Sequence, residues 1–367
     1  MQSRARAELL SDALLANLRA LSAHAGARVL LPVKANGYGH GLAQVVRATR
    51  DAACVWGYGV ATPQEALEAA REAGGKVVLL MTPATPDEAA ELAAAGVRLT
   101  VSDAGQLAGL PRGARVHVKV NTGMNRLGVL PLEAARVATT VAETCTLEGV
   151  FTHFASADEP DLAFAREQLA RFGGVVRAVK AAVPGVVAHA SNSGGVLSFG
   201  RDAAFDLIRP GMASYGFPPP HLAGIVPLFP ALRVTARVLQ VHEVQPGESV
   251  SYSALWTAER ATRVAVVAFG YADGYPRGAT LRAHVVVRGE RRGVLGRICM
   301  DQCMVDVTGT NVRAGDWVEL YGTGPVTAAD VAEWGGTIPY EVYVRLGPRV
   351  ERVVATDAAA TAEERRA

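Results

Sequence analysis

Cysteine, net charge and long apolar runs are all scarce in this sequence of 367 residues. Its four cysteines form neither a CxxC pair nor a disulfide ladder, which favours a reducing compartment. The formal net charge is only +2, so the charge balance predicts neither nucleic acid nor an acidic membrane as a partner. Polar residues at Asp12, Asn17 and Arg19 interrupt the apolar N-terminus, which therefore resembles neither a signal peptide nor a membrane span. We expect a cytoplasmic enzyme or binding protein.

Motifs for metals and dinucleotides are also missing. His40, His117 and His189 are spread without ligand spacing, and the cysteines are too few for a cluster, so we expect no metal site. The glycines around residue 270 open no helix after a strand and therefore predict no dinucleotide-binding loop.

What the sequence does contain, over its first 225 residues, is an alternation of short apolar runs with alanine-rich helical stretches. The predicted strands cover residues 29–33, 55–60, 77–81, 97–101, 115–120, 149–154, 186–190 and 205–208. Eight apolar strands alternating with helices are typical of a (β/α)8 TIM-type barrel. An open doubly wound sheet remains the alternative, because periodicity does not show whether a sheet closes.

Helix starts are marked most clearly at two places. Thr62 and Glu65, and then Thr85 and Glu88, form capping boxes with proline at the first helical position. Helices are also expected over about 42–52 and 161–182.

After about residue 225 the pattern changes to strands with tight turns. The predicted strands cover 234–244, 262–269, 284–287, 304–307 and 317–321, and a helix follows at 328–334. This pattern predicts a mostly β domain. We therefore expect a barrel over 9–225, a β domain over 226–355 that a strand at 4–8 can join, and a disordered tail over 356–367.

Lys34 ends the first apolar strand and is followed by a glycine-rich turn that contains Tyr38. A buried strand can hold such an amine away from water. Because desolvation disfavours the ammonium form, the lysine can then act as a nucleophile toward a carbonyl. The alternative is an ordinary surface lysine at a strand end.

Polar residues recur where other predicted strands end. Lys119, His153, Asn192 and Arg209 lie at or just after the ends of strands five to eight. In a barrel, chemistry takes place at these carboxyl ends. The predicted barrel therefore has a polar rim around Lys34.

The loops after strands seven and eight are the usual phosphate site of such barrels. Here Ser193 offers a hydroxyl, and Gly211 and Met212 offer backbone N–H groups. An amine nucleophile beside a phosphate site suggests pyridoxal phosphate (PLP) held as a Schiff base to Lys34. Arg209 is the candidate partner of the ring nitrogen. A guanidinium stays protonated and leaves that nitrogen neutral, which favours proton exchange at Cα over transamination.

The chain resembles the bacterial alanine racemases, PLP-dependent enzymes with a barrel and a C-terminal β domain. The resemblance covers nearly the whole chain and rests on residues 33–41, 119–126, 151–154, 192–193, 209–211, 249–252, 270–275, 299–301 and 340–341. It implies a homodimer in which Lys34 exchanges the proton on one face of alanine and the partner subunit's Tyr252 serves the other. The reference pKa of tyrosine is about 10, so the family places His153 and Arg209 behind this phenol.

Further roles follow from the same resemblance. The residues expected at the cofactor, besides Lys34, His153 and Arg209, are Tyr38, Asn192, Ser193, Gly211, Met212 and Tyr340. Arg126 and the backbone of Met300 are expected to meet the substrate carboxylate. Lys119 matches a lysine that is often carbamylated and braces the arginine, and Tyr271 and Asp301 are expected to line the entrance.

Three positions depart from the family pattern. Gly37 replaces the usual alanine, which should loosen the turn before Tyr38. Asn121 replaces a common aspartate and Ser253 a common glycine. None of the three is a proposed catalytic group.

Other functions remain open on sequence alone. A PLP-dependent decarboxylase of basic amino acids has a similar architecture, but it normally places an acid at the ring nitrogen, where this chain has Arg209. A PLP carrier protein is usually a barrel alone, which would leave residues 226–367 without a purpose. A racemase of another small amino acid, such as serine, is the nearest alternative.

Overall fold

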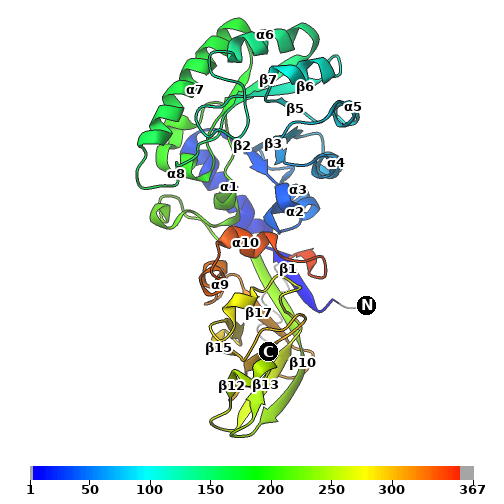
Figure 1. Cartoon of the computed structure of the whole chain (residues 1–367), viewed down its shortest axis with the longest axis vertical. Coiled ribbons are helices and arrows are strands. Elements are labelled where there is room, and N and C mark those ends of the chain that lie inside the picture. The colour runs from blue at the N-terminus through cyan, green and yellow to red at the C-terminus, as the bar shows by residue number, and fades with distance from the viewer. Residues whose placement is uncertain (1–2, 356–367) are drawn as a thin grey trace. The chain divides into compact units, whose positions relative to one another are not determined.

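The computed structural model describes residues 3–355, which pack into two compact units (Figure 1). The barrel unit comprises Asp12–Gly37 and Val45–Phe229. The C-terminal unit comprises the chain up to Ser11, the segment Tyr38–Gln44 and the chain from Pro230 onward. The tail expected to be disordered, 356–367, lies outside the described residues.

The barrel unit contains eight parallel strands in the order β4-β3-β2-β9-β8-β7-β6-β5. They are β2 (Arg28–Pro32), β3 (Val55–Val60), β4 (Val77–Leu80), β5 (Leu99–Val101), β6 (Arg115–Lys119), β7 (Thr146–Phe151), β8 (Val187–His189) and β9 (Leu207–Ile208). The sheet closes at Arg98, whose N–H donates to Val78 O (2.8 Å) and whose carbonyl accepts from Leu80 N (3.0 Å). The barrel prediction is therefore confirmed over the open sheet.

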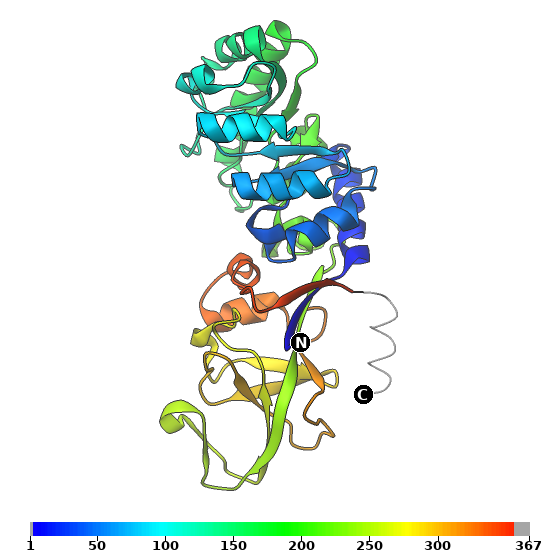
Figure 2. The same ribbon diagram turned by 90° about the vertical axis from the view of Figure 1, so that its right-hand side faces the viewer.

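Helices connect the strands. They are α1 (Ser11–Ala25), α2 (Lys34–Tyr38), α3 (Leu42–Thr49), α4 (Pro63–Glu72), α5 (Pro86–Ala94), α6 (Ala134–Thr144), α7 (Ala163–Ala182) and α8 (Ser193–Phe199). Both predicted capping boxes are confirmed, with Thr62 and Glu65 beginning α4 and Thr85 and Glu88 beginning α5. Figure 2 shows α4 and α5 side by side against the strands.

Several predicted strand boundaries are wrong by two or more residues, and two of them lie next to predicted site residues. The strand expected at 149–154 ends at Phe151, where its ladder with β6 stops at the pair Lys119 and Phe151. His153 therefore follows the strand instead of ending it. The strand expected at 205–208 begins only at Leu207, because Phe205 has φ 50°, a left-handed conformation that interrupts extended backbone.

The C-terminal unit is built on a second sheet of eight strands, in the order β13-β16-β15-β14-β17-β10-β1-β18. They are β1 (Ala5–Leu9), β10 (Leu232–Val244), β13 (Thr262–Val267), β14 (His284–Val287), β15 (Glu290–Leu295), β16 (Cys303–Asp306), β17 (Trp317–Tyr321) and β18 (Glu351–Val354). A further pairing of β13 with β10 closes six of these strands into a ring. The ladder between β10 and β13 runs from Val238 to Val244 and contains a register shift between Val238 and Gln240.

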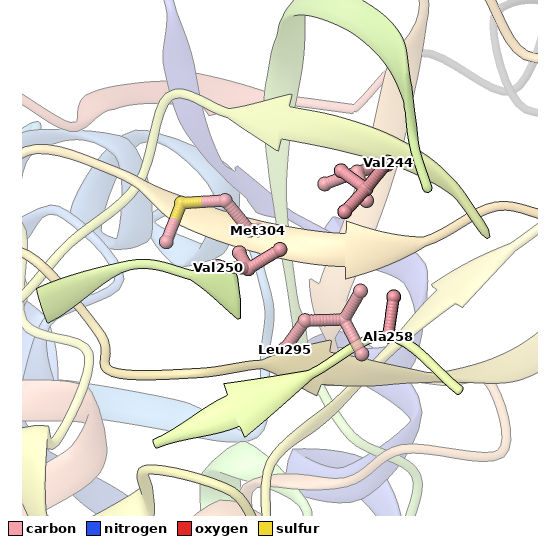
Figure 3. Packing of buried hydrophobic residues seen from close by; sticks show 6 residues of the cluster. Val244, Val250, Ala258, Leu295 and Met304 are labelled. Atoms are coloured by element: carbon pink, nitrogen blue, oxygen red, sulfur yellow. The ribbon is translucent and has the colours of Figure 1, made fainter. Parts of the chain in front are cut away.

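One apolar cluster of this unit lies beneath a short hairpin, β11 (Ser249–Val250) and β12 (Trp256–Thr257). The cluster consists of Val244, Val250, Ala258, Val264, Leu295 and Met304 (Figure 3). Burial of such side chains contributes about 1.5–3 kcal/mol each, so the cluster fixes the hairpin on the sheet.

Two helices complete the C-terminal unit, α9 (Ala328–Gly335) and α10 (Pro339–Val344). Helix α10 was not expected from the sequence, although Pro339 occupies its first turn, a position that proline favours. Among residues 3–355 we find no helix whose length and hydropathy would let it span a bilayer.

Candidate active site

Lys34 lies two residues after β2, which ends at Pro32 and not at the lysine as predicted, and a left-handed turn follows it. Ala35, Asn36 and Gly37 have φ values of 51°, 53° and 63°, and the Ala35 N–H donates to Glu65 Oε1 (2.6 Å). Burial, and then the positive charge of Arg126, lower the pKa of Lys34, while Glu65 opposes them. The lysine amine is thus shifted toward the neutral form that a nucleophile needs.

Arg209 follows β9 and is fully enclosed in the barrel unit. Its Nη2 donates to the carbonyls of Thr152 (2.6 Å) and Ala190 (2.9 Å), and its Nη1 lies 2.7 Å from His189 Nδ1. Burial lowers the pKa of Arg209 to about 9, which still leaves it protonated at neutral pH. The guanidinium is therefore a cation held in one orientation by backbone and imidazole acceptors.

Lys119, the last residue of β6, and Arg209 both lie close to the aromatic ring of Phe151. Lys119 Nζ lies 4.6 Å from the centre of the Phe151 ring, and Arg209 Cζ lies 5.5 Å from it. Burial first, then Arg209 and Arg126, lower the pKa of Lys119 well below its ordinary value. Among residues 3–355 no carboxylate lies within ion-pair distance of this amine.

His153 lies beside the same guanidinium. Its Nδ1 is 3.4 Å from Arg209 Nη2. Burial, and then the charges of Arg209 and Lys119, lower the pKa of His153 well below its usual value, so the imidazole is neutral. Since the arginine can only donate, Nδ1 is the acceptor and Nε2 carries the proton.

The residues after β8 and β9 form the third part of the barrel site. Ser193 Oγ accepts from the N–H of Ala213 (3.1 Å), which joins the start of α8 to the segment after Gly211, where Met212 is buried. Asn192 caps α8: its Oδ1 accepts from Gly195 N (2.9 Å). The structure thus gives Asn192 a capping contact, and its expected place at a cofactor stays a prediction.

The C-terminal unit brings together another pair of predicted residues, Tyr38 and Tyr340. Their ring centres are 6.4 Å apart. Burial, and then Tyr340, raise the pKa of Tyr38, so its phenol stays protonated and can donate. The neighbouring Gly39 has φ 83°, and a Cβ there would overlap the Tyr343 carbonyl of α10.

The remaining predicted residues lie on loops of the C-terminal unit. Tyr252 begins a single 3-10 turn in the β11–β12 hairpin and is 68% exposed. Met300, 53% exposed, is fixed to the neighbouring loop, where its carbonyl accepts from Ala272 N (3.0 Å). Asp301 accepts from Arg349 Nη1 (2.7 Å). Tyr271, 40% exposed, donates its N–H to Cys299 O (3.0 Å).

From the sequence, His117 and His189 were considered only as metal ligands, whereas the structure places them in contact with each other and His189 in contact with Arg209. No group of three or more metal-ligating side chains occurs within residues 3–355. The two-residue periodicity of a strand was the signal in the sequence that could have drawn attention to His117. His117 lies two residues before Lys119 on β6, so both side chains point to the same face of the strand.

Comparison with known proteins identifies the family. Residues 10–219 match the family described as "Alanine racemase, N-terminal domain", and residues 231–354 match "Alanine racemase, C-terminal domain". The chain belongs to the alanine racemase family.

Relatives and solved structures cover almost the whole chain. The alanine racemases of Deinococcus deserti and Deinococcus radiodurans are 58% and 56% identical to it, over 96% of this chain and 99% and 100% of their own. The crystal structure of alanine racemase from a D-cycloserine-producing Streptomyces lavendulae has a TM-score of 0.83 at 35% identity, covering 97% of this chain and 98% of its own. That from Bartonella henselae, with covalently bound pyridoxal phosphate, has 0.83 at 28% identity, covering 96% of this chain and 100% of its own.

Alanine racemases depend on PLP, and the charges of the barrel unit fit that cofactor. The charges that shift the pKa values of Lys34, Lys119 and His153 come mainly from cations, namely Lys34, Lys119, Arg126 and Arg209. The acid among them is Glu65, which acts on Lys34. The rim therefore carries excess positive charge, which the phosphate of PLP and the carboxylate of an amino acid would balance.

Proposed function

We propose that this chain interconverts L-alanine and D-alanine, with Lys34 and the partner subunit's Tyr252 as the two bases of each active site. The observation that carries the proposal is that the partly desolvated amine of Lys34 and the enclosed cation Arg209 both act electrostatically on His153. The first group can bind a carbonyl cofactor, and the second can donate to its ring nitrogen without giving up a proton.

PLP, when bound, supplies electron withdrawal that makes the substrate Cα–H acidic. The chain's residues then direct the proton. Lys34 would hold the cofactor and exchange a proton on one face of Cα. The expected phosphate ligands are Ser193, Gly211 and Met212 of the barrel unit, and Tyr38 and Tyr340 of the C-terminal unit. Asn192 stays among the expected cofactor contacts.

Tyr252 would exchange the proton on the opposite face. Its side chain is largely exposed within its own subunit, as expected of a group that serves a neighbouring one. His153 and Arg209 would lie behind the phenol and stabilise its deprotonated form. This arrangement requires a homodimer with shared active sites.

Arg126 and the backbone of the partner subunit's Met300 would bind the substrate carboxylate, while Tyr271 and Asp301 would line the entrance. Crowding by Tyr252, Tyr340 and Met300 is expected to exclude substrates with large side chains. Lys119 would act indirectly. Its neutral amine would attack carbon dioxide and release one proton to solvent, and the resulting carbamate would supply the anion that its surroundings lack.

The visible spectrum of the purified protein, followed by chiral analysis after addition of L-alanine, tests the proposal. We expect the absorbance of bound PLP and a drift to equal amounts of both enantiomers. Lys34→Ala should abolish the absorbance, and an unchanged spectrum would refute the assignment. Release of carbon dioxide from a basic amino acid would favour a decarboxylase. Faster racemisation of serine than of alanine would favour a serine racemase. We retain a cytoplasmic location as part of this proposal.

A further inference from the structure

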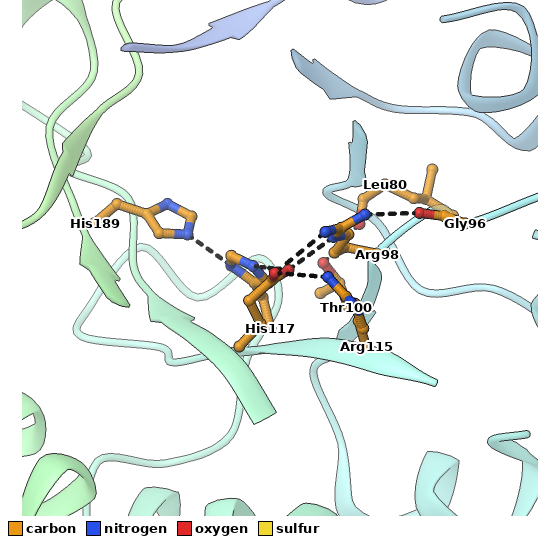
Figure 4. Close-up of polar contacts among 8 residues, drawn as sticks. Leu80, Gly96, Arg98, Thr100, Arg115, His117 and His189 are labelled. Carbon is orange, nitrogen blue, oxygen red and sulfur yellow. Dashed lines mark hydrogen bonds and ion pairs between the residues drawn. The ribbon is translucent and has the colours of Figure 1, made fainter. Parts of the chain in front are cut away.

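A row of polar side chains crosses the interior of the barrel unit from Glu148 to Arg209. Glu148 accepts from Arg98, with Nε 2.8 Å from Oε2 and Nη2 3.2 Å from Oε1. His117 Nε2 lies 3.6 Å from Glu148 Oε2, and His117 Nδ1 lies 2.9 Å from His189 Nε2 (Figure 4). His189 Nδ1 completes the row at 2.7 Å from Arg209 Nη1.

The row connects the two ends of the barrel. Arg98 precedes β5, and Glu148 is the third residue of β7, so the acid lies toward the amino ends of the parallel strands. Arg209 follows the carboxyl end of β9. Room for the row is built into the backbone, since a Cβ at Gly149 would overlap the His117 imidazole.

The direction of every hydrogen bond follows from Arg209. A guanidinium can only donate, so His189 Nδ1 must accept. Burial lowers the pKa of both histidines, which are therefore neutral and carry one proton each. The proton of His189 then lies on Nε2 and is donated to His117 Nδ1. The proton of His117 in turn lies on Nε2, where it faces the carboxylate.

We propose that Glu148 is a positioning residue for the reaction, because it fixes the tautomers of His117 and His189 and thereby the orientation and hydrogen bonding of Arg209. This inference rests on the proposed function, in which Arg209 faces the cofactor ring. Only a group that accepts and never donates keeps all protons pointing one way. Burial alone would raise the pKa of Glu148, but the neighbouring His117, 3.6 Å away, and the hydrogen bonds from Arg98 lower it to about 2, so the carboxylate persists.

The isosteric variant Glu148→Gln reverses this logic. An amide oxygen in place of Oε1 would face Arg98 Nη2 and Arg115 Nη1, two groups that can only donate. The NH2 group in place of Oε2 would then face Arg98 Nε and His117 Nε2. His117 would then have to carry its proton on Nδ1 and confront the N–H of His189. The conflict would pass to Arg209, whose contact with His189 is lost. A purely stabilising ion pair, the usual role of the amino-end face of a barrel, would not move the tautomers.

The test is 15N NMR of the holoenzyme labelled at histidine, with kinetics on the same samples. In the wild type we expect both His117 and His189 as neutral Nε2–H tautomers from pH 7 to pH 9. In Glu148→Gln we expect Nδ1–H signals and a kcat about tenfold lower, with KM for alanine changed less than kcat. Glu148→Asp, which keeps an acceptor-only carboxylate, should retain the wild-type tautomers and recover part of kcat.

Glu72→Gln is the matched control, because it removes a carboxylate from a barrel-unit ion pair with Arg47 and should change neither tautomers nor kcat. A protonated or Nδ1–H histidine at 117 or 189 in the wild type would overturn the proposal. So would wild-type tautomers and kcat in Glu148→Gln. Absence of racemisation by the wild type would instead refute the proposed function, and the tautomers would still decide the role of Glu148.

Discussion

At the scale of single residues, the site depends on an amine whose surroundings lower its pKa. Lys34 is half-buried and lies near Arg126, and both effects lower its pKa. A base with a lowered pKa becomes deprotonated at a lower pH than an ordinary lysine, so its reaction with a carbonyl should reach its maximal rate at a lower pH.

The rate at which the cofactor-stripped protein rebinds PLP measures this property. Arg126→Leu removes a positive charge, so the pKa of Lys34 should rise and the rate profile should shift to higher pH by about one unit or less. Arg136→Leu, which removes an exposed arginine of α6, should leave the profile in place. A profile that moves to lower pH in Arg126→Leu would contradict the electrostatic account.

Gly37 illustrates how a departure from a family pattern can have a conformational reason. The sequence predicts a looser turn at this position, and the structure gives Gly37 φ 63°, a region that glycine adopts without strain. Gly37→Ala should therefore lower the free energy of unfolding by about 1 kcal/mol. Gly293→Ala, where φ is not left-handed and space is open, is the control for thermal unfolding. A stabilised Gly37→Ala would contradict the strain argument.

At the scale of elements, close approach of two loops places Met300. A Cβ at Gly270 would overlap the carbonyls of Cys299 and Met300. Gly270→Ala should push the loops apart, cost about 2 kcal/mol of stability and raise KM for alanine. Gly293→Ala again serves as the control, since nothing lies near its Cβ. Thermal unfolding together with KM checks this, and wild-type values for both would contradict the placement of Met300.

Elements with local signals were predictable from the sequence, and elements that depend on distant contacts were not. The capping boxes at Thr62 and Thr85 and the eight apolar runs act within a few residues, so they fixed helix starts and the barrel. The early end of β7 depends on pairing with β6, and the left-handed Phe205 carries no local signal.

The same division applies to the site. Residues at strand ends, such as Lys34 and Arg209, could be predicted because a parallel barrel brings all carboxyl ends to one rim. The row through His117 and His189 was missed, because it depends on which side chains from non-adjacent parts of the sequence face each other inside the barrel.

At the scale of the whole molecule, the central claim is that a subunit completes its neighbour's active site. Tyr252 and Met300 are both more than half exposed in the subunit that carries them. If they serve the partner, activity requires a dimer, and sedimentation should find the active species at twice the subunit mass. A fully active monomer would contradict the shared site.

Complementation between two inactive variants tests this claim most directly. Lys34→Ala and Tyr252→Ala homodimers should each lack racemase activity. Co-expression with separate tags and purification of the mixed dimer should restore one intact site, made of Lys34 from one subunit and Tyr252 from the other, with about half of the wild-type activity per dimer. A mixed dimer as inactive as its parents would show that each subunit uses its own tyrosine and would contradict the account.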